Sequence, residues 1–576
     1  MGQESDTLQR DPRPAARDRV FLQLRRPLVA GLLLFLVYLA ASLATNPGGS
    51  LGSDVGAKVA TLKVAEENGG GDLDVGYWAE DVDPEGVLHP LYQSNRVGDR
   101  WIAVTTLPML AAAVPLWLLG GYRAVVLLAM AGSVAAAFAA RAIARRLGAR
   151  DGWSAYWLVG LASPVAIYAL VFWEHSTGVA LLAWAVVLLL DVLHGKAGWR
   201  TACGAGALIG LAATMRTEAL LYGAVVVAAV LLRLLVFDGP YRESLFVRFR
   251  RTVGFGIAAA LGVALLLAAN ELLERAWLGG PLRSTRAVGT AESSGVHLGA
   301  RVDEAYRTLL GVNQVAEPAR DALIGLLILV PLLIGGIALS RRRERLLPVA
   351  MVLASWALFL VVFRNGPGFL PGLFAASPLA VFGLVAMWRS ADRRTLGIAA
   401  LVAVPGVVYF GYVGGGIPQW GGRYLLLSGF LLLVLATLDL PKLDALGATL
   451  LIVPAVAVTI FGFVWTVQRS HTLAEFGELV AARPEPVVVT TSAFQFRETA
   501  AFYEDGRYLA LPLRSQLPVL ENALERLGVE EFALLEPEDP DEEPIGAIGP
   551  YEPTTTDVEE FLPGVDYRIV HYELTT

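Results

Sequence analysis

Long apolar stretches recur along almost the whole chain, and they constrain its fold more than any other feature. Runs of roughly 17–25 hydrophobic residues are separated by polar segments that carry arginine clusters. A run of this length forms a helix that can cross the hydrocarbon core of a bilayer. Only 17% of the residues are charged, whereas a soluble chain carries about a quarter. We therefore expect a polytopic all-α membrane protein.

Arginine clusters predict the orientation, because loops rich in Lys and Arg stay on the cytoplasmic side. The segment 1–26 carries six arginines beyond its ninth residue, so the N-terminus is expected inside. Further clusters lie at 141–150, 242–251, 341–345 and 389–394. All of them face inward only if one early apolar segment does not cross. Ile102–Leu119, interrupted by Pro108 and Pro115, is predicted to lie along the outer face instead.

This assignment gives thirteen spans with the C-terminus outside. The predicted spans are Pro27–Thr45, Arg123–Ala140, Trp153–Phe172, Thr177–Leu193, Thr201–Thr214, Ala219–Val236, Thr252–Leu273, Leu323–Ser340, Leu347–Phe363, Leu373–Trp388, Leu396–Val413, Tyr424–Leu440 and Leu446–Val467. We expect a protein of the cytoplasmic membrane whose membrane domain covers 27–470. Within that domain, residues 46–121 form the first outer loop with juxtamembrane helices.

The segment 471–576 has a different pattern. Short apolar runs, such as 486–491 and 508–513, alternate with a helix-like stretch at Leu517–Leu527 and an acidic loop at 536–544. This alternation predicts a small external α/β domain. It contains no glycine-rich phosphate loop, dinucleotide fingerprint or zinc spacing. The charge pattern along the chain is that of a membrane protein, so no nucleic-acid partner is expected.

The first acidic residue after the first span is Asp54, at the head of the long outer loop. A carboxylate at a membrane surface is a candidate general base. Asp54 would equally suit the start of a helix over Val55–Glu67, and capping is compatible with catalysis. The same loop holds two further carboxylates, Asp72 and Asp74, and a histidine, His89, that we interpret as a plain loop residue.

Arg216 and Glu218 lie in AATMRTEALL, between two apolar runs that are each barely long enough to cross the membrane. Ionisable groups at such depth usually face a cavity. We predict that Arg216 binds an anionic lipid phosphate with help from Arg423. The alternative is that Arg216 only pairs with Glu218, or extends to lipid headgroups.

Glu174 and His175 lie at the end of an apolar run, in FWEHST. They are interpreted as a second acid with a histidine near the reacting groups. A divalent metal, Mg or Mn, is an open possibility, although no ligand spacing fixes its geometry. The alternative is a helix end in an aromatic belt with a capping histidine. The candidate catalytic residues are Asp54 and Glu174, and the candidate substrate-binding residues are Lys58, His175, Arg216, Glu218, Trp420 and Arg423.

As a set, these motifs resemble the GT-C glycosyltransferases, which include protein O-mannosyltransferases and the aminoarabinose transferases of lipid A. The resemblance covers residues 27–470 and rests on LASPVAIYALVFWEHS, GLAATMRTEALLY and QWGGRYLL. It implies about thirteen membrane helices, with juxtamembrane helices in the first outer loop.

In function, the resemblance implies an inverting transfer of a sugar, such as mannose or arabinofuranose, from a polyprenyl-phosphate donor on the outer face. The acceptor is a glycan, a protein or a lipid. By resemblance, Asp54 is the catalytic base. Many members carry two adjacent acids at this point, whereas here Val55 follows Asp54. Metal dependence and the identity of a second carboxylate therefore stay open.

Two other classes of function fit a polytopic membrane protein. A transporter or lipid flippase also buries charged residues, but it often shows paired broken helices and lacks a long first outer loop with a large external domain. A non-catalytic partner in polymer assembly or export is the second alternative. An assay of sugar transfer with Asp54 intact and with Asp54→Asn separates these classes from an enzyme.

Overall fold

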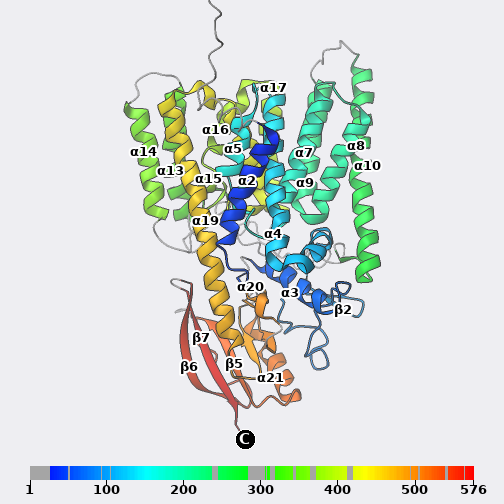
Figure 1. Cartoon of the computed structure of the whole chain (residues 1–576), viewed down its shortest axis with the longest axis vertical. Helices are drawn as coiled ribbons and strands as arrows, with labels where there is room; N and C mark the ends of the chain where they lie inside the picture. The colour runs from blue at the N-terminus through cyan, green and yellow to red at the C-terminus, as the bar shows by residue number, and fades with distance from the viewer. Residues whose placement is uncertain are drawn as a thin grey trace, which may run out of the picture.

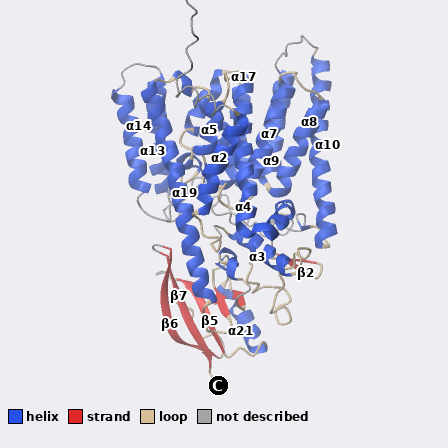
Figure 2. Cartoon of the chain, in the orientation of Figure 1, coloured by secondary structure: helices blue, strands red, loops and turns tan. Residues whose placement is uncertain are grey.

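The computed structural model of the chain has two parts, a bundle of long helices and a smaller domain built on a sheet (Figure 1). The strands gather at the end of the molecule where the chain finishes (Figure 2). The structure describes residues 26–49, 52–92, 94–103, 106–236, 244–282, 305, 308–311, 318–340, 346–363, 371–411, 420–492, 495–503, 506–538, 543–562 and 565–575.

The bundle has a helix or a broken helix at each of the thirteen predicted spans. The long helices are α2 (Pro27–Leu43), α4 (Leu107–Arg146), α7 (His175–Leu193), α8 (Trp199–Met215), α9 (Glu218–Val236), α10 (Leu245–Leu278), α13 (Pro318–Ser340), α14 (Leu346–Phe363), α17 (Ala391–Gly411), α18 (Leu426–Thr437) and α19 (Ala445–Ala481). Six of the described helices are long and apolar enough to cross a membrane, and shorter apolar helices pack beside them. The prediction of a polytopic helical membrane protein is confirmed.

Two of the predicted spans are interrupted. Trp153–Phe172 was expected as one helix, but α5 (Trp153–Leu161) ends before Ser163, and a single turn, α6 (Pro164–Ile167), follows. Similarly, Leu373–Trp388 consists of α15 (Leu373–Ala376), α16 (Ala380–Ala386) and the 3₁₀ turn η1 (Met387–Arg389). In both, the break lies at a Ser-Pro pair, since proline disfavours helical backbone in the residue before it. Hydropathy alone does not register such breaks.

The segment predicted to stay at the outer face is the first part of α4. That helix is broken at Gly120 and Gly121, where Gly121 adopts a φ of 56°. The preceding turns lie beside α3 (Ser53–Glu67) at the end of the bundle nearest the sheet (Figure 1). Trp117 Nε1 donates a hydrogen bond of 2.8 Å to Glu66 Oε2 and holds the two helices together.

The C-terminal domain contains a five-stranded sheet in the order β4-β3-β5-β7-β6. Its strands are β3 (Val488–Thr490), β4 (Tyr508–Ala510), β5 (Glu531–Pro537), β6 (Tyr551–Leu562) and β7 (Val565–Leu574). The first three are parallel to one another, and β7 pairs antiparallel with both β5 and β6. With α21 (Leu517–Arg526), they confirm the α/β prediction. β6 was not predicted, because residues 552–559 are exposed at the sheet edge and show no apolar alternation.

This domain and the first outer loop share one hydrophobic core. Loop residues contribute to it from one side and strand residues from the other: Val75, Tyr77, Leu88, Trp101, Val489, Leu509 and Phe532. Two hydrogen bonds fasten the contact, from Trp78 Nε1 to the Tyr508 carbonyl (3.0 Å) and from the Ala510 amide to the Leu88 carbonyl (2.9 Å). α19 continues from the bundle past residue 471 into the domain. The first outer loop, which contains Asp54, is therefore held in place by the C-terminal domain.

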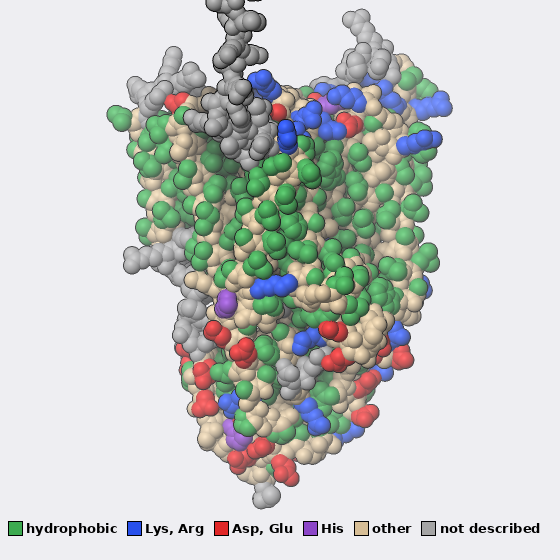
Figure 3. Space-filling model, in the orientation of Figure 1, with side chains coloured by type: hydrophobic (Ala, Val, Ile, Leu, Met, Phe, Trp, Pro, Cys, Tyr) green, Lys and Arg blue, Asp and Glu red, His purple; other side chains and the backbone are tan. Residues whose placement is uncertain are grey.

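Charge is distributed unequally along the long axis of the molecule. Lys and Arg side chains gather at the end of the bundle away from the sheet, and most Asp and Glu side chains lie at the sheet end (Figure 3). A green band of hydrophobic side chains lies between them. The positive-inside rule therefore still predicts that the basic end faces the cytoplasm and that the sheet domain lies outside.

This orientation can be tested directly. A reporter fused after Thr576 is expected to read as external, and one inserted ahead of α10, near Arg248 and Arg251, as cytoplasmic. Accessibility labelling on each side of sealed vesicles measures both. A cytoplasmic reading at the C-terminus would contradict the thirteen-span arrangement.

Candidate active site

Asp54 lies in the first turn of α3, at the junction of bundle and sheet domain. The helix begins at Ser53 with Gly52 as its N-cap, so the cap position predicted for Asp54 is filled by another residue. The Asp54 carboxylate instead approaches Trp173 Nε1 (3.4 Å) and Arg423 Nη1 (3.8 Å). Its side chain is 21% exposed. It therefore lies within reach of a substrate.

Four cations decide the ionisation of Asp54. Burial raises the pKa of its carboxyl, but Arg423, Arg497, Lys58 and Arg216 together lower it well below the usual range. Asp54 is therefore a carboxylate at neutral pH and accepts hydrogen bonds without first losing a proton. The surrounding positive charge also makes it a weak base while the site holds no anion.

Arg423 is positioned by a turn that only glycine permits. Gly421 and Gly422 have φ values of 71° and 62°. A Cβ on Gly421 would lie 2.3 Å from Pro164 of α6, so the turn packs directly on the break after α5. This contact joins two of the motifs that carried the family resemblance.

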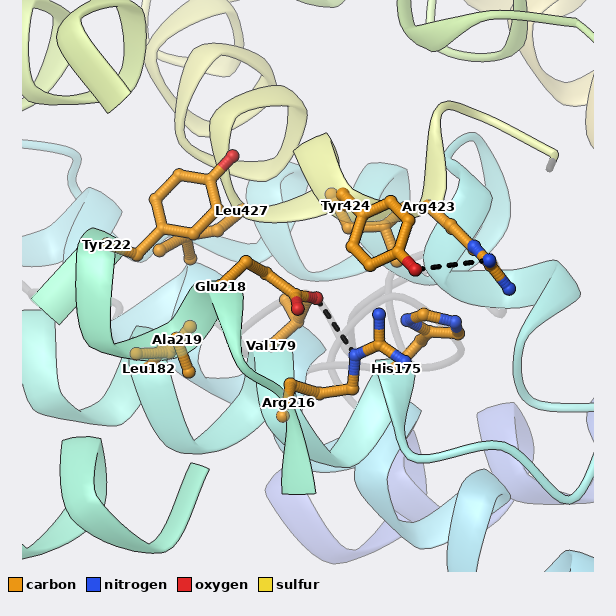
Figure 4. Close-up of a pocket in the computed structure, with 12 residues that line it drawn as sticks. His175, Val179, Leu182, Arg216, Glu218, Ala219, Tyr222, Arg423, Tyr424 and Leu427 are labelled. Carbon is orange, nitrogen blue, oxygen red and sulfur yellow. Dashed lines mark hydrogen bonds and ion pairs between the residues drawn. The ribbon is translucent and has the colours of Figure 1, made fainter. Parts of the chain in front are cut away.

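Two guanidinium groups flank the ring of Tyr424. The Arg423 guanidinium lies 4.7 Å from the ring centre, and that of Arg216 lies 5.0 Å from it. Arg423 Nη2 also donates to the Tyr424 hydroxyl at 3.1 Å, and Arg216 Nε donates to Glu218 Oε1 at 2.9 Å (Figure 4). The pairing of Arg216 with Glu218, which was the alternative to phosphate binding, is present, and both residues line a cavity.

The cavity is small and lined by His175, Arg216, Glu218, Tyr222, Arg423 and Tyr424 (Figure 4). Its volume is about 20 Å³, which is enough for about one water molecule. Among the described residues, His175 Nε2, Glu218 Oε2 and Arg423 Nε are buried there without a hydrogen-bond partner. Unsatisfied buried polar atoms are rare, so a group of three indicates a place for water or a polar ligand.

Lys58 and Glu174 form a buried ion pair behind this cavity. Lys58 Nζ lies 2.7 Å from Glu174 Oε1, and their side chains are 0% and 2% exposed. The Thr106 hydroxyl donates to the same carboxylate oxygen at 2.8 Å. Removing either partner would leave an uncompensated buried charge. The pair ties α3 to the start of α7, and so fixes Asp54 relative to His175.

The C-terminal domain adds Arg497, which sequence reasoning missed. Its side chain is fully buried, and Nη2 donates to the Ala103 carbonyl at 2.6 Å. The short helix α20 (Gln495–Glu498) packs so tightly on α3 that a Cβ at Gly56 would lie 1.3 Å from the Arg497 carbonyl oxygen. Nothing in the local sequence around Arg497 links it to a residue more than 400 positions earlier.

The remaining candidates have other surroundings. Trp420 is buried, accepts a hydrogen bond from the Tyr168 hydroxyl at its carbonyl, and packs on Trp465, so its ring supports the turn before Arg423. The Asp74 carboxylate accepts bonds from the Gly76 and Trp101 amides. Asp72 accepts from the Asp74 amide. These acids order the loop.

His89 is buried in that loop as a neutral imidazole. Nδ1 accepts a hydrogen bond from the Leu91 amide (3.1 Å), so Nε2 carries the proton and donates to the Gly76 carbonyl (3.2 Å). Burial lowers the pKa of His89 to about 3. The interpretation of His89 as a plain loop residue stays a prediction. Its hydrogen bonds within the loop give it a structural role, which can be tested by changing the pH.

Acidification is expected to destabilise the loop through His89. The unfolded imidazole takes up a proton near pH 6.5 and the folded one only near pH 3, so the stabilisation is complete above pH 6.5 and is lost as pH falls. At pH 5 the loss is about 2 kcal/mol. Thermal unfolding of the detergent-solubilised protein at pH 7 and pH 5 measures it. His89→Gln should flatten the difference, and an unchanged pH dependence in that variant would contradict the assignment.

The side chains that the structure describes around Asp54 and Glu174 do not form a binding site for a divalent metal. Among the described residues, no group of three His, Cys, Asp or Glu side chains could hold one. Glu174 and Glu218 are each paired with a cation, and Asp54 lies 3.8 Å from the Arg423 guanidinium.

No protein-family model and no curated protein sequence matches the chain. Among solved structures, it is similar to the oligosaccharyltransferase of Archaeoglobus fulgidus in the apo form, with a TM-score of 0.42 and 12% identity, over 87% of this chain and 69% of that one. It is also similar to ArnT from Cupriavidus metallidurans in the apo state, with a TM-score of 0.40 and 14% identity, over 97% and 98% of the two chains. A second ArnT structure, bound to undecaprenyl phosphate, gives a TM-score of 0.37 and 13% identity over the same shares.

These structures belong to the superfamily that the sequence motifs resemble. At identities of 12–14%, the likeness concerns the fold alone.

Proposed function

We propose that this protein is a membrane glycosyltransferase that moves a sugar from a polyprenyl-phosphate donor to an acceptor hydroxyl on the outer face. The observation that carries the proposal is the pairing of a partly exposed carboxylate, Asp54, with the guanidinium of Arg423 at 3.8 Å. The Arg216 guanidinium also lies near the Tyr424 ring, and both arginines line the same cavity. A base and an anion-binding pair are the two things that this transfer needs.

The reaction is a single displacement. The acceptor oxygen attacks the anomeric carbon, the bond from that carbon to the phosphate oxygen breaks, and the phosphate leaves with the bonding electrons. The acceptor proton passes to Asp54. Attack from the face opposite the leaving group inverts the anomeric configuration. The new glycosidic bond replaces the sugar–phosphate bond, so atoms and charge balance without a cofactor.

The cations serve both the leaving group and the base. Arg423 and Arg216 hold the phosphate through charge-assisted hydrogen bonds, for which the planar guanidinium is well shaped. A bound phosphate also offsets the positive charge that depresses the pKa of Asp54. Asp54 therefore becomes a stronger base once the donor is bound, so it accepts a proton from the acceptor hydroxyl mainly when the donor is present.

The supporting residues take roles that follow from their contacts. Glu174 is held by Lys58 and Thr106, so we assign it to positioning α3 and not to proton transfer. His175 lines the cavity with Nε2 directed at no described partner, and it is placed to donate to a donor oxygen. The cavity now has room for about one water, so donor binding requires the side chains around Tyr424 to shift.

The main alternative is a transporter or lipid flippase. Transporters often contain paired broken helices, and the breaks between α5 and α6 and between α15 and α16 favour this alternative. The test is a reconstituted assay with polyprenyl-phosphate mannose and polyprenyl-phosphate arabinofuranose as donors and cell-envelope glycan, protein and lipid fractions as acceptors. Transfer that depends on Asp54 supports the enzyme. Donor translocation across the vesicle bilayer without transfer overturns the proposal in favour of a flippase.

A further inference from the structure

A second feature lies far from the active site, at the other end of α9. An apolar groove of about 510 Å³ runs between α9 and α17. Its walls include side chains that are exposed on the outer surface of the bundle, among them Leu232 (61%), Val236 (58%) and Val402 (56%). The groove therefore opens to the lipid that surrounds the bundle.

The groove has the length of one leaflet. It extends from Val225 to Val236 on α9 and from Ala391 to Val402 on α17. Eleven steps along a helix cover about 16 Å. Half of the hydrocarbon core of a bilayer is about 15 Å thick. One acyl chain of a lipid in a single leaflet therefore matches the groove from end to end.

One end of the groove is positively charged. Arg233 and Arg394 line it there, where α9 finishes and α17 begins. Arg233 Nε lies 3.7 Å from Asp392 Oδ1. Arg394 forms no ion pair with a carboxylate in the part of the chain that the structure describes, and its guanidinium lies 5.2 Å from the ring centre of Trp388. Trp388 is 60% exposed, as expected of an aromatic residue at the headgroup level.

We infer that this groove binds an anionic glycerophospholipid of the cytoplasmic leaflet, with one acyl chain between α9 and α17 and its phosphate at Arg394 and Arg233. Charge complementarity selects an anionic headgroup, because an exposed guanidinium without a carboxylate partner attracts phosphate. The length selects a glycerophospholipid over a polyprenyl phosphate, whose chain extends well beyond one leaflet. The inference is independent of the proposed function.

The experiment measures lipid retention on the full-length protein. Delipidated protein is titrated with phosphatidylglycerol, phosphatidylcholine or polyprenyl phosphate in mixed micelles, and bound lipid is counted by native mass spectrometry. Phosphatidylglycerol is expected to be retained in preference to phosphatidylcholine, and any polyprenyl phosphate that binds at the active site is expected not to depend on Arg394. Arg394→Gln should weaken that retention about tenfold, which corresponds to about 1.4 kcal/mol. Ala228→Trp, which fills the groove without changing its charge, should also lower it.

Arg250→Gln is the matched control, since Arg250 lies exposed on α10 and does not line the groove. It is expected to leave phosphatidylglycerol retention unchanged. An unfolding transition in wild type, Arg250→Gln and Arg394→Gln shows that folded protein is compared. The rise in unfolding temperature caused by phosphatidylglycerol should be equal in wild type and Arg250→Gln and smaller in Arg394→Gln. Equal retention of phosphatidylcholine, a loss of polyprenyl phosphate in Arg394→Gln as large as the loss of phosphatidylglycerol, or an equal loss of phosphatidylglycerol in Arg250→Gln would each overturn the inference.

Discussion

Replacement of Asp54 by asparagine is expected to lower sugar transfer by about 100-fold or more while the protein still folds. Asparagine keeps the size of the side chain and its ability to accept a hydrogen bond from Trp173 Nε1. It removes the proton acceptor, and general base catalysis contributes typically 10²–10⁴-fold. Turnover of polyprenyl-phosphate sugar at saturating donor and acceptor measures the effect.

The matched control is Asp72→Asn, which changes a carboxylate of the same loop that accepts a hydrogen bond from the Asp74 amide. It should retain most of its activity. Near-normal turnover in a well-folded Asp54→Asn variant would contradict the assignment and move the base to Asp72, Asp74 or Glu174. Of these, the buried pairing of Glu174 with Lys58 makes it the least suited to take a proton.

Removal of Arg216 is expected to weaken use of the donor by about 10–100-fold. Hydrogen bonds to a charged group contribute about 1.5–3 kcal/mol, and each 1.4 kcal/mol corresponds to a factor of ten. The effect should appear in donor saturation, whereas the apparent affinity for the acceptor should change less. Arg216→Lys should recover only part of it, because an ammonium cannot bind a phosphate in a bidentate way.

The ion pair complicates the single variant, since Arg216→Ala leaves Glu218 buried without its partner at 2.9 Å. Arg216→Ala combined with Glu218→Gln removes that charge as well. The double variant is expected to recover protein yield and to keep the donor defect. If the double variant restores normal donor saturation, Arg216 serves only to neutralise Glu218, and the phosphate-binding role is wrong.

The spans could be predicted from the sequence because each needs only a local property. A helix in a bilayer satisfies its own backbone hydrogen bonds, so an apolar run of the right length is sufficient. Charge parity and two prolines, which are also local signals, predict that Ile102–Leu119 lies along the outer face, and the structure shows a break in α4 at Gly120 and Gly121, directly after this segment. The breaks after α5 and α15 did not follow, although the Ser-Pro pairs that cause them were visible. Hydropathy does not distinguish one helix from two half-helices in line.

Within the site, the sequence by itself determined which side chains can carry charge at the outer ends of helices: Asp54, Glu174, Arg216 and Arg423. Only the tertiary structure decided their partners. Glu174 forms an ion pair with Lys58. Asp54 faces Arg423, because the Gly421–Gly422 turn that carries Arg423 packs against Pro164 at the break after α5. Arg497 belongs to the sheet domain and lowers the pKa of Asp54 electrostatically. The position of that domain depends on the hydrophobic core that it shares with the first outer loop. Electrostatic pairing acts across space, and no local pattern along the chain records which distant residues will meet.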